Sequence, residues 1–159
     1  MTPTVDERLA SIVRALTEVS RPHLPPEASL AQEQVQLAIG HLQILRAQLD
    51  DVPAFEREEL ADAVAIAKSL IAEIDGGTQT RAALTALASA ASADGSDVRG
   101  QTGIINRAVD ALVKAVAADG AEGAMASLSR IILGHEQARV MKDRKWFLPF
   151  GFDTIVGAA

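Results

Sequence analysis

Apolar residues recur every three to four positions along most of the chain, and no stretch alternates apolar and polar residues with a period of two. Side chains three or four positions apart share one face of an α-helix, whereas a half-buried strand would alternate. The pattern therefore predicts six helices. Their approximate bounds are residues 4–19, 29–50, 53–75, 78–93, 102–118 and 121–145.

Residues that start or end helices stand at the boundaries of these segments. Thr4 and Glu7 have the spacing of a capping box, and Ser29 and Gln32 repeat it. Prolines follow the first segment, a glycine pair follows the third, and the turn residues of 94–97 predict a loop. The expected fold is all-α, an up-and-down bundle of about six helices whose residues 1–145 form a single domain.

The C-terminal segment concentrates nearly all the aromatic residues of the chain. The 159 residues include five aromatics, four of them within seven positions, and Pro149 prevents a simple continuation of the last helix. Large aromatic side chains left in water would form an aggregation-prone patch. Residues 146–159 are thus expected to be a non-helical docking tail, packed on the bundle or on a partner subunit. Its proposed interface residues are Trp146, Phe147, Phe150 and Phe152.

A short basic run precedes this tail. Residues 139–145 contain four cations and one aspartate, a net charge of +3, while the whole chain carries −6. Such a separation favours association with an acidic surface, on the same chain or on a partner. The overall negative charge opposes binding to nucleic acids and to anionic membranes, so neither partner is expected.

The composition also excludes several classes of protein. The chain has no cysteine, which excludes disulfide frameworks, thiolate metal sites and cysteine nucleophiles and fits a reducing cytosol. Charged residues interrupt the first fifteen positions, and the uncharged run at 82–93 is too short and too weakly apolar to span a bilayer. A cytoplasmic protein is expected. Eleven Arg against four Lys, with abundant Ala, suggests a GC-rich bacterial genome.

Motifs that carry catalytic or metal chemistry are missing. The run from His135 to Arg139 begins like a zinc-protease motif, but an arginine stands where the second histidine ligand is required. No Glu-x-x-His pair, phosphate-binding loop, calcium loop or nucleophile elbow occurs. No metal or cofactor is expected, and the sequence argues against an enzyme without closing the question.

His41 is the first candidate binding residue. It shares one side of the second predicted helix with Gln34 and Gln48, seven positions before and after it, and leucines and an isoleucine alternate with these polar residues. Buried amides and imidazoles need hydrogen-bond partners. The three side chains therefore indicate a satisfied polar seam or the edge of a dimer contact, or else one wall of a small-molecule pocket.

His135 and Arg139 are the second candidate pair. They lie one turn apart on the sixth predicted helix, where its apolar face becomes basic, and Gly134 leaves room for a close neighbour. An imidazole followed by a guanidinium could bind a carboxylate or phosphate. The alternative is a histidine bonded across the core, with the cations marking where the helix emerges into water.

These observations favour a non-enzymatic helical bundle that acts through protein association. A homodimer is expected, with tails docked reciprocally across a twofold axis, and the chain could also be an accessory to another protein. The alternative is a small-molecule binding protein with a pocket between helices for an apolar or carboxylate-bearing ligand.

Overall fold

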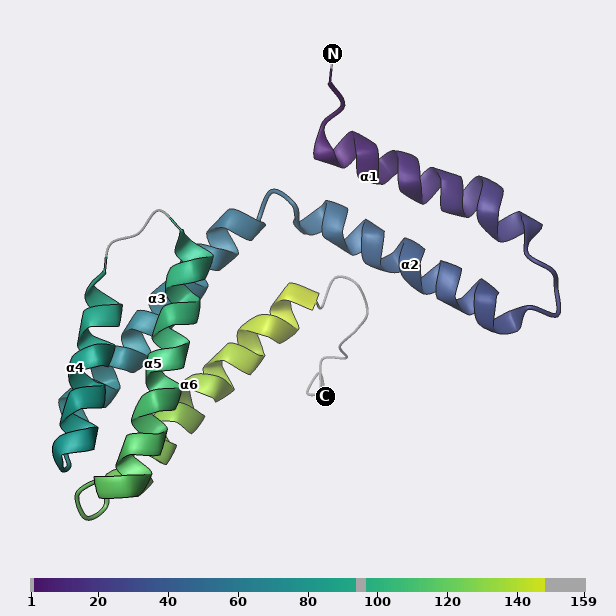
Figure 1. Cartoon of the computed structure of the whole chain (residues 1–159). Helices are drawn as coiled ribbons and strands as arrows, with labels where there is room; N and C mark the ends of the chain where they lie inside the picture. Colours follow the sequence, from purple (N-terminus) through teal and green to yellow (C-terminus); the bar gives the residue numbers. More distant parts are fainter. Residues whose placement is uncertain (1, 94–96, 148–159) are drawn as a thin grey trace, which may run out of the picture. The chain divides into compact units, whose positions relative to one another are not determined.

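The computed structural model describes residues 2–93 and 97–147, and six α-helices account for most of them (Figure 1). An isolated bridge between Gly76 and Gly120 is the extent of strand-like pairing in these two ranges. The predicted all-α helical bundle is therefore confirmed. The helices are α1 Val5–Arg14, α2 Ser29–Gln48, α3 Val52–Glu73, α4 Thr78–Ser92, α5 Val98–Asp119 and α6 Ala124–Phe147.

The contacts divide the chain into two compact units, Met1–Pro53 and Ala54–Ala159. The first contains α1 and α2, and the second contains nearly all of α3 together with α4, α5 and α6. The single domain expected over residues 1–145 stays a prediction, and measurements of unfolding and hydrogen exchange can test it.

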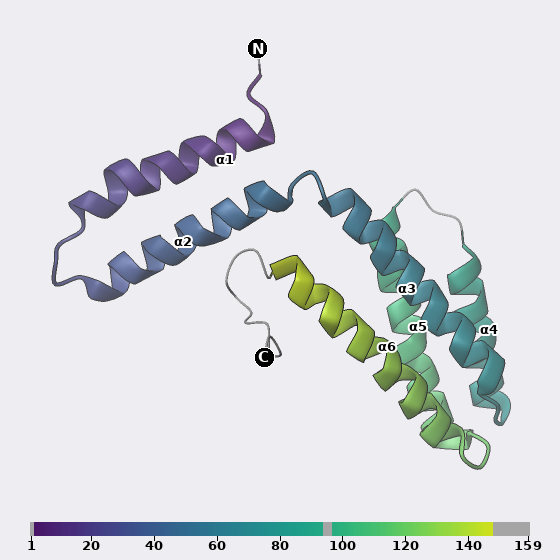
Figure 2. The ribbon, with the colours of Figure 1, turned by 180° about the vertical axis from the view of Figure 1, so that it is seen from behind.

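The first unit is a hairpin of two helices that lie side by side in both views (Figures 1 and 2). Thr4 and Glu7 form the predicted capping box, with the Thr4 amide donating to Glu7 Oε2 at 2.7 Å. A bidentate pair between Arg46 of α2 and Asp6 of α1, at 2.8 and 3.0 Å, joins the helices. α1 contains no buried residue, so the hairpin encloses little core.

The second unit is a four-helix, up-and-down bundle with a continuous aliphatic core (Figure 2). The apolar seam of α3, which repeats at steps of three and four, lies in or against this core with residues of α4, α5 and α6. Enclosure by four helices removes the central side chains from water completely. Those with no exposed surface are Ala67, Leu70, Leu87, Ile105 and Leu112, together with the polar Thr80.

Asp119, at the end of α5, caps the beginning of α4. Its carboxylate accepts hydrogen bonds from the amides of Gln79 and Thr80 at 2.7 and 2.9 Å and from the Thr80 hydroxyl at 2.7 Å. These bonds satisfy amides at the start of α4, because the N-cap residue of this helix, Gly77, provides no side-chain acceptor for them. A Cβ on Gly77 would lie 2.5 Å from Asp119 Oδ2, which explains a glycine at the N-cap. The hydrogen bond from Thr80 is the main cause that lowers the pKa of Asp119.

Two helix starts differ from the predicted ones. α5 begins at Val98, four residues before the expected start, because the Asp97 carboxylate accepts from the Gly100 amide and caps the helix. The capping box predicted at Ser29 and Gln32 is wrong. The Gln32 amide group instead donates to the carbonyl oxygen of Pro25 at 2.9 Å and ties α2 to the preceding loop.

α6 continues two residues beyond its predicted end, through Trp146 and Phe147. Phe150 and Phe152, the other two residues expected at an interface, lie outside the described residues. Within the described ranges, no helix combines the length and the apolar character needed to cross a membrane.

Candidate functional site

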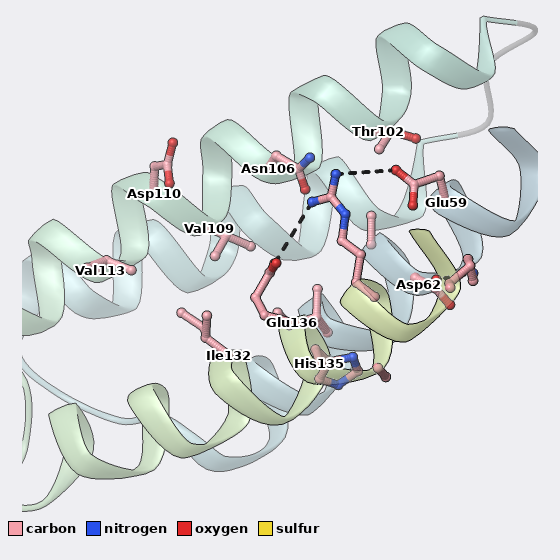
Figure 3. A pocket seen from close by; sticks show the side chains of 15 residues that line it. Glu59, Asp62, Thr102, Asn106, Val109, Asp110, Val113, Ile132, His135 and Glu136 are labelled. Carbon is pink, nitrogen blue, oxygen red and sulfur yellow. Dashed lines mark hydrogen bonds and ion pairs between the residues drawn. The ribbon is translucent and has the colours of Figure 1, made fainter. Parts of the chain in front are cut away.

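A cleft between α3, α5 and α6 contains His135 and Arg139, the two residues that the sequence placed on one face of the last helix (Figure 3). Its volume is about 540 Å³. All three walls belong to the second unit, and Lys142 continues the same face of α6 one turn after Arg139. The structure thus places this predicted pair in a concave site.

The cleft has an apolar end and a polar end (Figure 3). Val109, Val113 and Ile132 lie toward one end, with Asp110 beside the two valines, and Glu59, Asp62 and Thr102 lie at the other. Each wall follows helical spacing, so one face of each helix supplies both kinds of side chain. The arrangement suits a ligand that is itself apolar at one end and polar at the other.

The cations of the cleft face carboxylates of the same chain. Arg139 approaches Glu59 at 3.6 Å and Glu136 at 4.0 Å, the two pairs marked by dashed lines in Figure 3. Lys142 donates a hydrogen bond to Asp62 and lies 3.6 Å from Glu58. The contact with Asp62 raises the pKa of Lys142.

The lining as a whole carries an excess of negative charge. Two cations stand among four carboxylates, so the net charge of the lining is −2 with His135 neutral. The carboxylates are Glu59, Asp62, Asp110 and Glu136. The sequence suggested an anion site at His135 and Arg139, whereas this geometry surrounds the arginine with acidic groups.

The basic run that precedes the tail lies in part against acidic α3. Because α3 and α6 are the first and fourth helices of an up-and-down bundle, the start of α3 meets the end of α6 (Figure 2). The Trp146 ring also packs on the Phe55 ring of α3, with centroids 4.5 Å apart and planes tilted by 31°. Part of the predicted docking segment therefore contacts its own chain.

The other predicted binding residues lie along α2 in the first unit. Gln34 and His41 are exposed, while Gln48 is buried. They occupy one side of the helix with Leu30 and Leu37, which are 68% and 45% exposed. On this side of α2, exposed surface therefore extends from Leu30 to His41.

Sequence reasoning missed the acidic half of the cleft. The sequence does contain both sets of charges. Glutamates at 56, 58 and 59 lie near the start of one predicted helix, and the basic run lies at the end of another. Spacing along the chain does not show that these two helix ends meet. Gly134 was expected to admit a close neighbour, and this was wrong, since a Cβ there would meet nothing within 4 Å.

His135 lines the cleft and makes no hydrogen bond or ion pair with a described residue. No group of three His, Asp or Glu side chains is placed to hold a metal ion in the described ranges. Comparison with known proteins finds no family model, no curated protein and no solved structure that matches this chain.

Proposed function

We propose that this protein acts by self-association, with the α1–α2 hairpin of one copy packed on the hairpin of a second. The observation that carries the proposal is the set of large apolar side chains that the hairpin leaves in water. Exposed singly, such residues are ordinary, but here six of them lie on α1, on the segment that follows it and on α2. They are Val5, Ile12, Val19, Leu30, Leu37 and Leu45, each between 45% and 68% exposed.

On α1, two of the exposed residues are one seven-residue repeat apart. Val5 and Ile12 share one face of this helix, and the exposed Val19 lies in the π-helical segment Ala15–Ser20 that follows it. α1 also contacts α2, and the half-buried residues of α1 include Leu9 and Val13 rather than Val5 and Ile12. These exposed residues are therefore additional to the surface that the hairpin itself uses.

On α2, the open side has the spacing of a coiled-coil seam. Leu30, Gln34, Leu37 and His41 alternate at steps of four and three. The residues beside the seam are small, including Ala38 and Gly40, and a Cβ on Gly40 would meet nothing within 4 Å. Small flanking residues let a second helix approach closely.

The seam can pair with a second copy of itself. Under a twofold axis that pairs antiparallel α2 helices, Leu30 faces His41 and Gln34 faces Leu37, so the Leu37 side chains of the two copies flank the axis. The polar side chains must then keep hydrogen-bond partners at the edge of the contact. Glu33 is the one charged residue between positions 30 and 41, so little like-charge repulsion opposes the pairing. Covering all six apolar residues on both copies would bury on the order of 1,000 Å², the lower range of specific interfaces.

The working environment proposed for this dimer is the cytoplasm of a bacterium. The cysteine-free composition suits a reducing compartment, and the high ratio of Arg to Lys with abundant Ala suits a GC-rich bacterial genome. A role as accessory to another protein stays open, since the same hairpin face could be shared with a different chain.

A charge placed in the seam tests the proposal. Leu37→Glu should convert a dimer into a monomer, because it would bury a carboxylate at the twofold contact. Gln36→Glu adds the same charge at the neighbouring exposed position outside the seam and should remain dimeric. Sedimentation velocity between about 1 and 100 μM measures the mass, and circular dichroism confirms that both variants stay helical.

Two results would contradict self-association. One is a wild-type chain that stays monomeric over the whole concentration range. The other is a dimer that survives Leu37→Glu unchanged, which would place the contact on a different surface.

A further inference from the structure

The two halves of α6 are held in the second unit in different ways. Ala124, Leu128 and Ile131, in the first half, are buried in the core of the bundle, whereas none of residues 132–147 is buried. The cleft of about 540 Å³ lies between this second half, α3 and α5 (Figure 3). The second half of α6 therefore borders a cavity, while the first half packs on a core.

Charged groups supply most of the contacts that join the second half of α6 to α3. Arg139 lies 3.6 Å from Glu59, and Lys142 donates a hydrogen bond to Asp62 and lies 3.6 Å from Glu58. The side chains in these pairs are between 20% and 64% exposed. Water and dissolved ions therefore reach each pair.

Exposed ion pairs depend on salt in a way that an aliphatic core does not. Each such pair is weak, and the distance over which charges attract falls from about 10 Å at 0.1 M salt to about 3 Å at 1 M. The Trp146 ring on Phe55 adds a contact near the end of the helix that salt does not screen. Salt should therefore loosen the second half of α6 by degrees and leave the core around Leu128 intact.

We propose that residues 132–147 of α6 form a strap over the cleft, closed by the ion pairs with α3 and opened by rising ionic strength. Opening uncovers apolar side chains on the walls that α3 and α5 provide. They are Ala63, Ile66, Val109 and Val113. The strap thus couples access to the cleft to the ionic surroundings, and it lies wholly in the second unit, apart from the hairpin surface proposed for association.

A single introduced thiol can report on the opening, because the chain has no cysteine. Ala63 is 6% exposed and lines the cleft, so the thiol of Ala63→Cys should react slowly with iodoacetamide while the strap is closed. Its rate should rise about tenfold between about 0.05 and 1 M NaCl. Ala67→Cys, in the core with no exposed surface, should stay protected, and Ala65→Cys, exposed on the same helix, corrects for the effect of salt on the reagent.

Matched charge variants in the Ala63→Cys background test whether the ion pairs close the strap. Arg139→Met with Lys142→Met removes both cations and should give fast labelling already at low salt, with little further response to salt. Arg130→Met removes the cation that pairs with Glu73 in the first half of α6 and should leave the labelling unchanged. Asp62→Lys with Lys142→Asp exchanges the partners of one pair and should keep the protection and its salt dependence.

Hydrogen exchange of the unsubstituted full-length chain provides an independent measurement. As salt rises, the amides of residues 136–147 should exchange faster, while those of Leu128 and Ile131 stay protected. Leu37→Glu should show the same response, so the strap and self-association can fail independently.

The salt response also defines the results that would overturn the proposal. One is a thiol in Ala63→Cys that stays equally protected at every salt concentration. Another is a variant without the cations at 139 and 142 that behaves like wild type. Simultaneous exposure of the Ala63→Cys and Ala67→Cys thiols would likewise contradict the strap, because the whole bundle would then be opening.

Discussion

The two units of this chain place their large apolar side chains differently, although both are built from amphipathic helices. In the described residues of the first unit, two apolar residues are buried and six large ones are exposed; in the second, thirteen are buried and six exposed. Four helices can enclose a core, whereas two helices share a single contact. An apolar stripe on the hairpin therefore needs a further surface to be covered.

The difference teaches that an amphipathic pattern predicts which face of a helix avoids water but not what covers it. The stripe of α3 is covered within its own bundle. On α1, Val5 and Ile12 also have helical spacing, yet they remain 58% and 48% exposed. Truncating leucines in each unit should show this difference directly.

Leu112→Ala should destabilise the protein more than any other single substitution proposed for the two units. The side chain has no exposed surface, so its removal leaves a cavity in the core and should lower the free energy of unfolding by about 2–5 kcal/mol. Leu37→Ala removes the same atoms from an exposed position on α2 and should change the stability of the monomer by less than about 0.5 kcal/mol. Urea unfolding at the lowest practicable concentration compares the two, and equal losses would mean that the hairpin stripe is covered within one chain.

Asp119→Asn should have an intermediate effect, confined to the second unit. The amide nitrogen cannot accept the bonds that the carboxylate accepts, so the start of α4 loses part of its cap and the melting temperature should fall by several degrees. Glu122→Gln, an exposed neutralisation three residues later, should leave the melting temperature unchanged.

The same variant has a predictable pH dependence. Because the pKa of Asp119 is lowered in the folded protein, its stabilising effect is fully present above the ordinary aspartate value of about 3.9. The effect is lost as the pH falls through the lowered pKa. The stability difference between wild type and Asp119→Asn should therefore narrow below about pH 4, and a constant difference down to pH 2 would show that ionisation of Asp119 is not involved.

Much of the fold follows from the sequence because helical periodicity and local caps are properties of neighbouring residues. Thr4 and Glu7 interact within one turn, and the capping box that their spacing predicts is confirmed. Aspartate favours both turns and caps, so the sequence around Asp97 predicts a start of α5 that is too late. At Gln32 the spacing predicts a capping box that does not form. The side-chain amide of Gln32 donates instead to the carbonyl oxygen of Pro25.

Half of the cleft could be predicted for a related reason. His135 and Arg139 lie one turn apart on one helix, so their shared face follows from spacing alone. Glu59 lies 80 positions before Arg139, and the 3.6 Å between them depends on which helices pack together. Spacing within a helix cannot supply that information, and so the sign of the charge in the cleft emerged from the structure.

The smallest predicted effect tests whether the two units unfold together. Gly40 and Gly134 both lie inside helices, and an added Cβ would meet nothing within 4 Å at either position. Each Gly→Ala substitution should stabilise its helix by roughly 0.5–1 kcal/mol.

For Gly134, in the enclosed bundle, the gain should raise the free energy of global unfolding. For Gly40, we expect slower hydrogen exchange of hairpin amides and little change in the bundle, because a hairpin with few buried residues opens before the core does. If Gly40→Ala raised the global free energy as much as Gly134→Ala, the hairpin and the bundle would unfold as one cooperative domain, and the contrast between the two units would be one of solvent exposure alone.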